Sequence, residues 1–396
     1  MVFTKCKMNI LFTIGSYDSF GGTERITTVL ANALAGEGVV VIAAFRGECR
    51  PEKFGLSSKV FCENLEGNSA ENLRAALLRY KIDVVINQWC LPFYVTRTIN
   101  KARRGLAVKL ISALHGLPDK SKKVIVAEDA VKKSRGISRL FARARLYATH
   151  LAIKASIRYV YRKSDAYVVL SEGFITVFKE YTGLKCLSRL YAIGNPITIK
   201  VDLPSPELAN KKKQIRYVGR MDKENKRVNR IIEAWEAVCG DYPDWNLLLV
   251  GGGPHLADLE RYVEEHAVPR VAFTGFLADD PIEQYKESSI FMLTSDLEGF
   301  GLVLVEAMSY GVVPVVYGSY VAVHDIVTDG KDGFITAMPY SQAETVAKMK
   351  MLMDDNSLMR RMSAAAIKKA NRFSLESTMD KWRGLLRKVA EVRTRK

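Results

Sequence analysis

The 396-residue sequence has no apolar run that approaches the roughly 20 residues of a membrane-spanning helix. Its first residues, MVFTKCKMNILFTIGSYD, lack the layout of a signal peptide, because the short apolar run ends in glycine and charge. The six cysteines are scattered without a CxxC pair, which argues against both a disulfide framework and a zinc site. We therefore expect a cytoplasmic protein with reduced thiols.

Acidic residues are scarce in the first half of the chain, where the positive charge gathers. The formal net charge is +16, to which residues 1–200 contribute +17 and residues 201–396 contribute −1. The segment 97–163 alone holds 18 basic and 3 acidic residues. A positive field of this kind indicates an anionic partner, which could be a membrane surface, a nucleic acid or a phosphorylated substrate.

Short runs that are apolar almost throughout alternate with longer helical stretches, a pattern typical of parallel strands covered on both faces. The fold class is therefore α/β, with two doubly wound domains. We predict a first domain over residues 1–195, a linker rich in proline and polar residues over 196–213, a second domain over 214–372 and a helical segment over 373–396 that could cross back to the first domain. The predicted strands are MNILFTI, VVVIAAF, DVVIN, VKLISA and AYVVL in the first half and QIRYVG, NLLLVG, VAFTG, IFMLT and VPVVY in the second.

The stretch DLEGFGLVLVEAMSYGVVPVV contains two glutamates, Glu298 and Glu306, with seven residues between them. Glu298 belongs to a glycine turn after a predicted strand, and a helix should begin between Phe300 and Leu302. The free N–H groups of that helix start would bind a phosphate. Glu306 lies about 7.5 Å along the axis from the helix start, where it could accept both hydroxyls of a ribose. Separately, each residue also fits an ordinary helix glutamate or an ordinary loop carboxylate.

Three further loops follow predicted strands. Gly21 and Gly22 precede a helix whose N-terminus could favour an anion. Arg220 follows a strand end, and Lys226 lies six residues further on, so that the two cations could clamp a diphosphate. The glycines at 251–253 would let the backbone approach a nucleotide. Taken alone, each loop could equally be an ordinary turn or a solvated basic loop.

The pattern EGFGLVLVEAMSYGVVPVV resembles the E-x7-E signature of glycosyltransferase family 4, which are retaining enzymes of the GT-B fold. Other motifs follow in that family's order over nearly the whole chain: GGTERITTVLANAL, LHG, SDAYVVLSEGF, GNPI, YVGRMDKENKRV, LLLVGGGP, FTGF and DGKDGFI. The resemblance implies two Rossmann-like domains facing across a cleft. The first would bind the acceptor and the second the nucleotide sugar.

The resemblance also implies roles for the matching residues. Arg220 and Lys226 would bind the donor diphosphate and stabilise it as it leaves, Glu306 would hold the ribose, Glu298 would position the transferred sugar and His115 would contact sugar hydroxyls. The implied catalytic residues are Glu298, Arg220, Lys226 and His115. The implied donor-binding set is Gly22, Arg220, Lys226, Phe276, Glu298, Gly299, Phe300, Gly301, Leu302, Val303 and Glu306, with the base bound near Phe276.

One departure from the family pattern is visible. The usual Lys-Gly pair reads Lys226-Arg227 and stands one residue further from the arginine than is commonest, so Arg227 could share the binding of the diphosphate. No pair of the DxD type stands at a strand end, and we expect metal-independent transfer without a cofactor. The donor is expected to be a hexose nucleotide, with UDP implied by the family and GDP as an alternative.

The segment 135–163 is predicted to be an amphipathic helix that attaches to an anionic membrane. Its predicted apolar face comprises Ile137, Leu140, Phe141, Leu151, Ile157 and Val160. Each nearby basic residue contributes on the order of 1 kcal/mol to binding an anionic leaflet. Trp89, Phe93 and Tyr94 could enter the interface or lie in the core.

We therefore expect a peripheral protein on the inner face of the plasma membrane and a lipid-linked acceptor bearing a pyrophosphate. This setting is similar to that of bacterial enzymes that build surface polysaccharides and lipopolysaccharide. Two other readings stay open: a nucleotide-sugar epimerase on a similar fold, and a non-enzymatic binder of anionic surfaces. Nucleic acid is disfavoured as the partner, because the basic residues lack a recognisable readout module.

Overall fold

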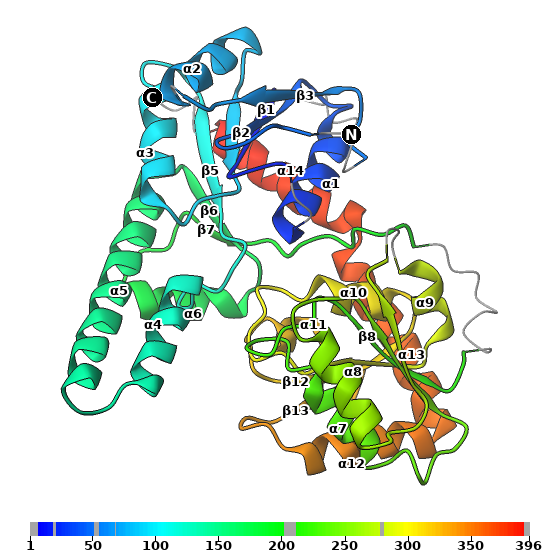
Figure 1. The fold of residues 1–396 in the computed structure, drawn as a ribbon. Helices are drawn as coiled ribbons and strands as arrows, with labels where there is room; N and C mark the ends of the chain where they lie inside the picture. Colours follow the sequence, from blue (N-terminus) through cyan, green and yellow to red (C-terminus); the bar gives the residue numbers. More distant parts are fainter. Residues whose placement is uncertain are drawn as a thin grey trace. The chain divides into compact units, whose positions relative to one another are not determined.

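The computed structural model describes residues 7–18, 21–50, 55–67, 69–201, 211–277 and 281–391. The chain divides into two compact units (Figure 1). Unit 1 comprises Met1–Gly194 and Thr378–Lys396, and unit 2 comprises Asn195–Ser377. Part of the predicted linker, residues 202–210, lies outside the described residues.

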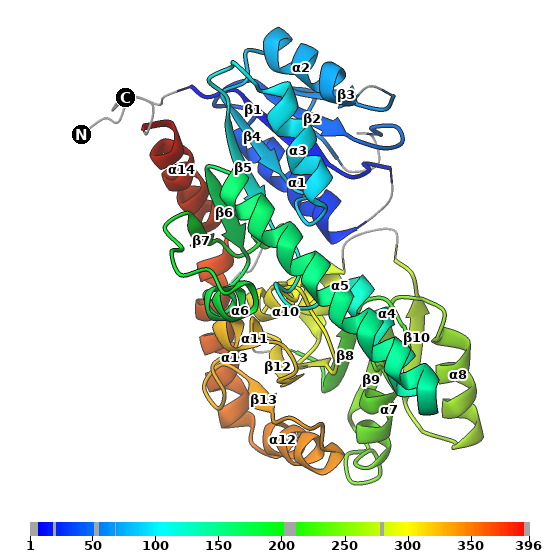
Figure 2. The same ribbon diagram turned by 90° about the vertical axis from the view of Figure 1, so that its left-hand side faces the viewer.

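Unit 1 is built on a parallel sheet in the order β3-β2-β1-β4-β5-β6-β7. In Figures 1 and 2, α2 and α3 lie on one side of this sheet and α1 and α14 on the other. The strands are β1 Ile10–Ile14, β2 Val40–Ala44, β3 Val60–Asn64, β4 Val84–Asn87, β5 Lys109–Ala113, β6 Ala166–Val169 and β7 Leu190–Ala192. The helices are α1 Gly22–Leu34, α2 Ser69–Arg79, α3 Phe93–Ala102, α4 Lys122–Lys133, α5 Gly136–Lys163 and α6 Gly173–Thr182.

Unit 2 repeats this architecture with a parallel sheet in the order β10-β9-β8-β11-β12-β13. Its strands are β8 Gln214–Val218, β9 Asn246–Val250, β10 Val271–Gly275, β11 Ile290–Leu293, β12 Val313–Tyr317 and β13 Phe334–Thr336. Its helices are α7 Asn229–Glu236, α8 Leu256–Glu265, α9 Ile282–Glu287, α10 Leu302–Ser309, α11 Val323–Ile326, α12 Gln342–Asp354 and α13 Asn356–Ala370, followed by the 3₁₀ turn η3 Asn371–Phe373. The predicted fold class, two doubly wound α/β domains, is confirmed.

The final helix, α14 (Leu375–Glu391), begins at the end of unit 2 and lies mostly within unit 1. Arg383 on this helix donates from Nε and Nη2 to Glu37 Oε1 of unit 1, at 2.9 and 2.7 Å. Lys388 lies over the ring of Tyr191, 4.9 Å from its centre. Apolar residues of α14, including Trp382 and Leu386, are buried.

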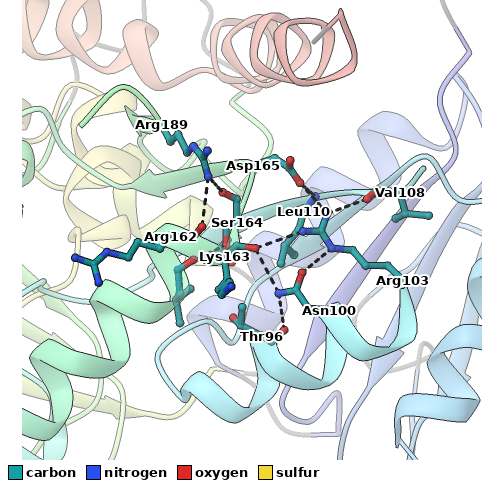
Figure 3. Close-up of polar contacts among 12 residues, drawn as sticks. Thr96, Asn100, Arg103, Val108, Leu110, Arg162, Lys163, Ser164, Asp165 and Arg189 are labelled. Carbon is teal, nitrogen blue, oxygen red and sulfur yellow. Dashed lines mark hydrogen bonds and ion pairs between the residues drawn. The ribbon is translucent and has the colours of Figure 1, made fainter. Parts of the chain in front are cut away.

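The C-terminal end of α5 is fixed to the rest of unit 1 by cationic and amide side chains (Figure 3). Arg189 donates to the carbonyls of Arg162 and Ser164, and both Asn100 and Arg103 donate to the carbonyl of Lys163. These are the carbonyls that a helix leaves unsatisfied at its last turn. Arg103 also pairs with Asp165 at 2.7 Å.

The predicted helix over 135–163 is present, but its apolar residues do not form one face. Ile157 and Val160 are fully buried, whereas Ile137, Leu140 and Phe141 are 78%, 68% and 72% exposed. At about 100° per residue, the buried and exposed groups point to opposite sides of the helix. The prediction of a single amphipathic face was therefore wrong, because residues from two different faces were combined.

Candidate functional site in unit 2

The order of the strands in unit 2 locates the candidate site. The chain winds outward in both directions from the adjacent strands β8 and β11, so the topological switch point lies between them. Ligands of open parallel sheets bind beyond the carboxyl ends of the strands at this point. The loops that follow β8 and β11 hold Arg220, Lys226 and Glu298, together with the start of α10.

Lys226 and Glu298 meet across these two loops. Lys226 Nζ lies 2.5 Å from Glu298 Oε1, and the two side chains are only 20% and 12% exposed. A pair so shielded from solvent is screened less by salt than a surface pair. The structure thus brings together two predicted site residues that are 72 positions apart.

A network of hydrogen bonds around Asp296 connects the loops that follow β8 and β11. Asp296 accepts from Arg227 Nε and from Arg230 Nη1, each at 2.6 Å, and its N–H donates to the carbonyl of Asn225 at 2.8 Å. Arg227 has a positive φ of 50°, the conformation that glycine adopts most readily. Its side chain is engaged with Asp296, which makes it a brace between the loops in this structure. Sequence reasoning did not single out Asp296 or Arg230.

The start of α10 supplies main-chain donors beside this ion pair. Gly301 at the N-cap has φ 91°, and a Cβ there would lie 2.9 Å from the hydroxyl of Tyr320, so no larger residue fits without a shift. Gly299 and Phe300 belong to the preceding turn, whereas Leu302 and Val303 are the first residues of α10, whose N–H groups have no partner within the helix.

Glu306 is buried on α10, with only 1% of its surface exposed. It is therefore not a partly exposed helix glutamate. Thr198, in the segment that enters unit 2, donates from Oγ1 to Glu306 Oε1 at 2.6 Å. This partner is 108 residues away in the sequence and was not predicted.

Arg220 does not join the ion pair of Lys226 and Glu298. Its side chain is 70% exposed, and its nearest carboxylate is that of Asp222 at 3.9 Å. Phe276 follows β10 and is 78% exposed, close to Gly252. A guanidinium in the loop after β8 and an aromatic ring in the loop after β10 are thus exposed to solvent.

The glycines at 251–253 have a packing role in unit 2. A Cβ at Gly251 would lie 2.0 Å from the carbonyl oxygen of Gly219, and one at Gly253 would lie 2.2 Å from that of Met221. These glycines let the loops after β8 and β9 pack backbone against backbone. The sequence indicated that these glycines let the backbone approach a nucleotide, but it did not predict these contacts between the two loops.

In unit 1, His115 follows β5, and its Nε2 lies 2.5 Å from Gln88 Oε1 at the end of β4. Burial lowers the pKa of His115 to about 4, so the ring is neutral at pH 7. Gly22 is the first residue of α1. The side chain of Glu24 lies against the start of this helix: its Oε2 is 2.2 Å from the position that a Cβ on Gly21 would occupy. Burial raises the pKa of Glu24.

Two properties of the described residues bear on the predicted partners. Within them, no three or more His, Cys, Asp and Glu side chains are grouped so as to hold a metal ion. None of their helices has both the length and the apolar character needed to cross a membrane.

Comparison with known proteins relates this architecture to glycosyltransferases. Residues 198–369 match the family model described as "Glycosyl transferases group 1", a range that contains all the unit 2 residues of the candidate site. The structure of Anabaena HepE in complex with UDP superimposes with a TM-score of 0.74 at 18% identity, covering 96% of this chain and 100% of that one. The fold is therefore that of GT-B glycosyltransferases.

Two curated relatives align along nearly their full length. An uncharacterised glycosyltransferase of Haemophilus influenzae is 26% identical over 95% of this chain and 99% of its own length. A Campylobacter jejuni enzyme, GalNAc-alpha-(1->4)-GalNAc-alpha-(1->3)-diNAcBac-PP-undecaprenol alpha-1,4-N-acetyl-D-galactosaminyltransferase, is 21% identical over 98% and 99%. Together with the family match, these similarities support a glycosyltransferase of the GT-B fold.

Proposed function

We propose that the protein is a retaining, metal-independent glycosyltransferase that moves a hexose from a nucleotide diphosphate sugar to a lipid-linked or polysaccharide-precursor acceptor. The observation that carries the donor assignment is the ion pair between Lys226 and Glu298 at the switch point of unit 2, beside the N-terminus of α10. UDP is the proposed nucleotide, in keeping with its presence in the HepE complex.

In this proposal the diphosphate lies between the ammonium of Lys226 and the first N–H groups of α10. Arg220, whose side chain is 70% exposed, would bind the other side of the diphosphate. The amides of Gly299, Phe300 and Gly301 would hold the sugar together with Glu298, while those of Leu302 and Val303 would hold the distal phosphate. Glu306 would accept the ribose hydroxyls, and the ring of Phe276 would lie against the base.

Cleavage of the bond between the sugar and the diphosphate places negative charge on the leaving group. Cations and amides already aimed at that charge lower the barrier, because they need no rearrangement as it develops. The hydrogen bond to Glu298 holds the ammonium of Lys226 in position. Retention of the anomeric configuration would follow from attack by the acceptor on the face of the leaving group. His115 is neutral and would act as a hydrogen-bonding group toward the sugar hydroxyls.

The proposed acceptor is linked to a polyprenyl diphosphate or another lipid. The Campylobacter relative has PP-undecaprenol in its name, and the segment 97–163 of this chain has 18 basic and 3 acidic residues. A positive surface would attract both an acceptor pyrophosphate and the anionic membrane that holds it. The enzyme would then work as a peripheral protein on the cytoplasmic face of the plasma membrane.

The first test is thermal unfolding of the full chain with UDP, GDP and their sugars, because a ligand that binds the native state raises the melting temperature. Hydrolysis and transfer are then measured with the stabilising donor, with and without EDTA. Lys226→Ala and Glu306→Ala should each lose transfer by orders of magnitude, while Lys223→Ala, an exposed lysine in the same loop, should retain it.

Near-normal transfer by both site variants would refute the assignment. Loss of activity in EDTA that added Mg²⁺ restores would refute metal independence. Conversion of the donor to an epimeric sugar in the absence of an acceptor would instead indicate the epimerase reading.

A further inference from the structure

The N-terminal half of α5 presents large apolar side chains to solvent. Ile137, Leu140, Phe141, Tyr147 and Leu151 are 78%, 68%, 72%, 67% and 49% exposed. At about 100° per residue they fall within an arc of about 120° on the helix. Single exposed apolar residues are common on protein surfaces, but five on one arc of one helix form a contiguous patch.

This exposed arc is separate from the one that anchors the helix. In the C-terminal half, Ile153, Ile157, Val160 and Tyr161 are buried in unit 1, on an arc centred about 150° away. Hydrogen bonds from Arg103 and Arg189 fix that end (Figure 3). One end of α5 is therefore built into unit 1, whereas the apolar side of the other end is left uncovered.

The α4–α5 hairpin, defined here as residues 122–151, also concentrates positive charge. Its segment 132–145 contains six basic residues and no acidic one. Arg143 and Arg145 flank the apolar arc on either side, each about 100° from its centre. Within the described part of the chain, neither arginine forms an ion pair with a carboxylate. Figures 1 and 2 show α4 running beside this half of α5, beyond the sheet of unit 1.

We infer that the α4–α5 hairpin docks on an anionic bilayer. The arc of Ile137, Leu140, Phe141, Tyr147 and Leu151 would enter the boundary between headgroups and acyl chains, and Arg143 and Arg145 would lie among the phosphates. An interfacial helix needs this combination of an apolar side and basic flanks. The charge complementarity favours a bilayer over a second copy of this chain, because two such hairpins would repel each other. The inference gives the proposed function its membrane contact, but binding to vesicles is measured without any transfer.

The test is flotation of the full chain with vesicles of phosphatidylcholine alone or mixed with phosphatidylglycerol, at low and high salt. Binding to the mixed vesicles is expected, with weaker binding to neutral ones. Arg143→Gln with Arg145→Gln should weaken it by about 25-fold, or about fivefold for each arginine. Leu140→Ser with Phe141→Ser should weaken it by about tenfold or more per residue.

Matched controls separate this face from general surface properties. Leu78→Ser removes a leucine that is 55% exposed on α2, and Arg360→Gln with Arg361→Gln removes two exposed charges from α13. Both should bind vesicles like the wild type. All variants should keep the wild-type melting temperature within a few degrees, because the substituted side chains are exposed.

Three results would overturn the inference. The first is absence of binding to the mixed vesicles at low salt, and the second is wild-type binding by the Leu140→Ser, Phe141→Ser variant. The third is a dimer in solution that this variant dissociates, which would make the patch a contact between copies of the chain. If UDP still raises the melting temperature in any of these cases, the proposed donor site survives independently.

Discussion

The ion pair between Lys226 and Glu298 leads to a prediction of opposite sign for its two members. Glu298 Oε1 lies 2.5 Å from the ammonium that we propose binds the donor diphosphate. If the proposal holds, the carboxylate and the diphosphate compete for the same cation. Removal of Lys226 should weaken the binding of UDP, whereas neutralisation of Glu298 should leave it unchanged or strengthen it.

The expected magnitudes follow from typical free energies of charged hydrogen bonds and of ion pairs. A hydrogen bond to a charged group contributes about 1.5–3 kcal/mol, so Lys226→Ala should raise the Kd of UDP by about 10- to 150-fold. Glu298→Gln removes a competing pair worth about 1 kcal/mol, which would lower the Kd by up to about fivefold. The same variant should lose transfer activity, because the group that we propose positions the sugar has lost its charge.

Calorimetric titration of UDP into the full chain measures these affinities directly. The variant that combines Lys226→Ala with Glu298→Gln should bind UDP as weakly as Lys226→Ala alone, since we propose that Glu298 acts on the nucleotide through Lys226. Lys223→Ala is the matched control for the loss of one positive charge from this loop. A tenfold or larger loss of affinity in Glu298→Gln would refute the reasoning, because it would mean that the carboxylate supports the bound state.

Three further predictions concern the supporting structure. Thr198→Val removes the 2.6 Å hydrogen bond to the buried carboxylate of Glu306. This change should lower the free energy of unfolding of unit 2, measured by urea titration, by about 1.5–3 kcal/mol. An unchanged free energy of unfolding would contradict the burial of that carboxylate. Gly301→Ala should cost roughly 1–2 kcal/mol from the positive φ alone, seen as a lower melting temperature, and more if Tyr320 cannot move. Burial lowers the pKa of Lys211 from 10.5 to about 7, so between these pH values the unfolded chain binds more protons than the folded chain and stability should rise with pH. The Lys211→Met variant should show a shallower rise in melting temperature from pH 7 to pH 10.5 than the wild type. An equal slope would show that Lys211 does not titrate in this range.

The sequence was most informative about strands buried on both faces. All ten predicted strands are present. Nine of them lie inside their sheets, where a parallel strand covered by helices must be apolar almost throughout. The tenth, β10, is an edge strand that is only partly buried. The strands not predicted are β3, β7 and β13, and each lies at the edge of its sheet. β3 has the sequence VFCEN and is only partly buried, while β7 and β13 have three residues each. Such strands carry too weak an apolar signal to be recognised.

Contacts between distant residues could not be read from the sequence. The motif spacing indicated that Glu298 and Glu306 flank a helix start, and the structure has that arrangement. It did not indicate that Thr198 bonds Glu306 or that Asp296 joins the two loops. In α5, the sequence showed apolar and basic residues at helical spacing, but which of them are buried depends on contacts with α3, α4 and α6.

The network around Asp296 connects the two loops of the candidate donor site. β8 and β11 are neighbouring strands, paired at Ile215 and Arg216, so their loops start from the same edge of the sheet. Beyond the strands, Asp296 bonds both Arg227 and Arg230, and the carbonyl of Asn225 accepts the N–H of Asp296. Lys226 stands between Asn225 and Arg227, so its backbone is fixed on both sides. In the proposed function, its ammonium would exchange one oxygen, that of Glu298, for another on an incoming phosphate while the rest of the site keeps its geometry.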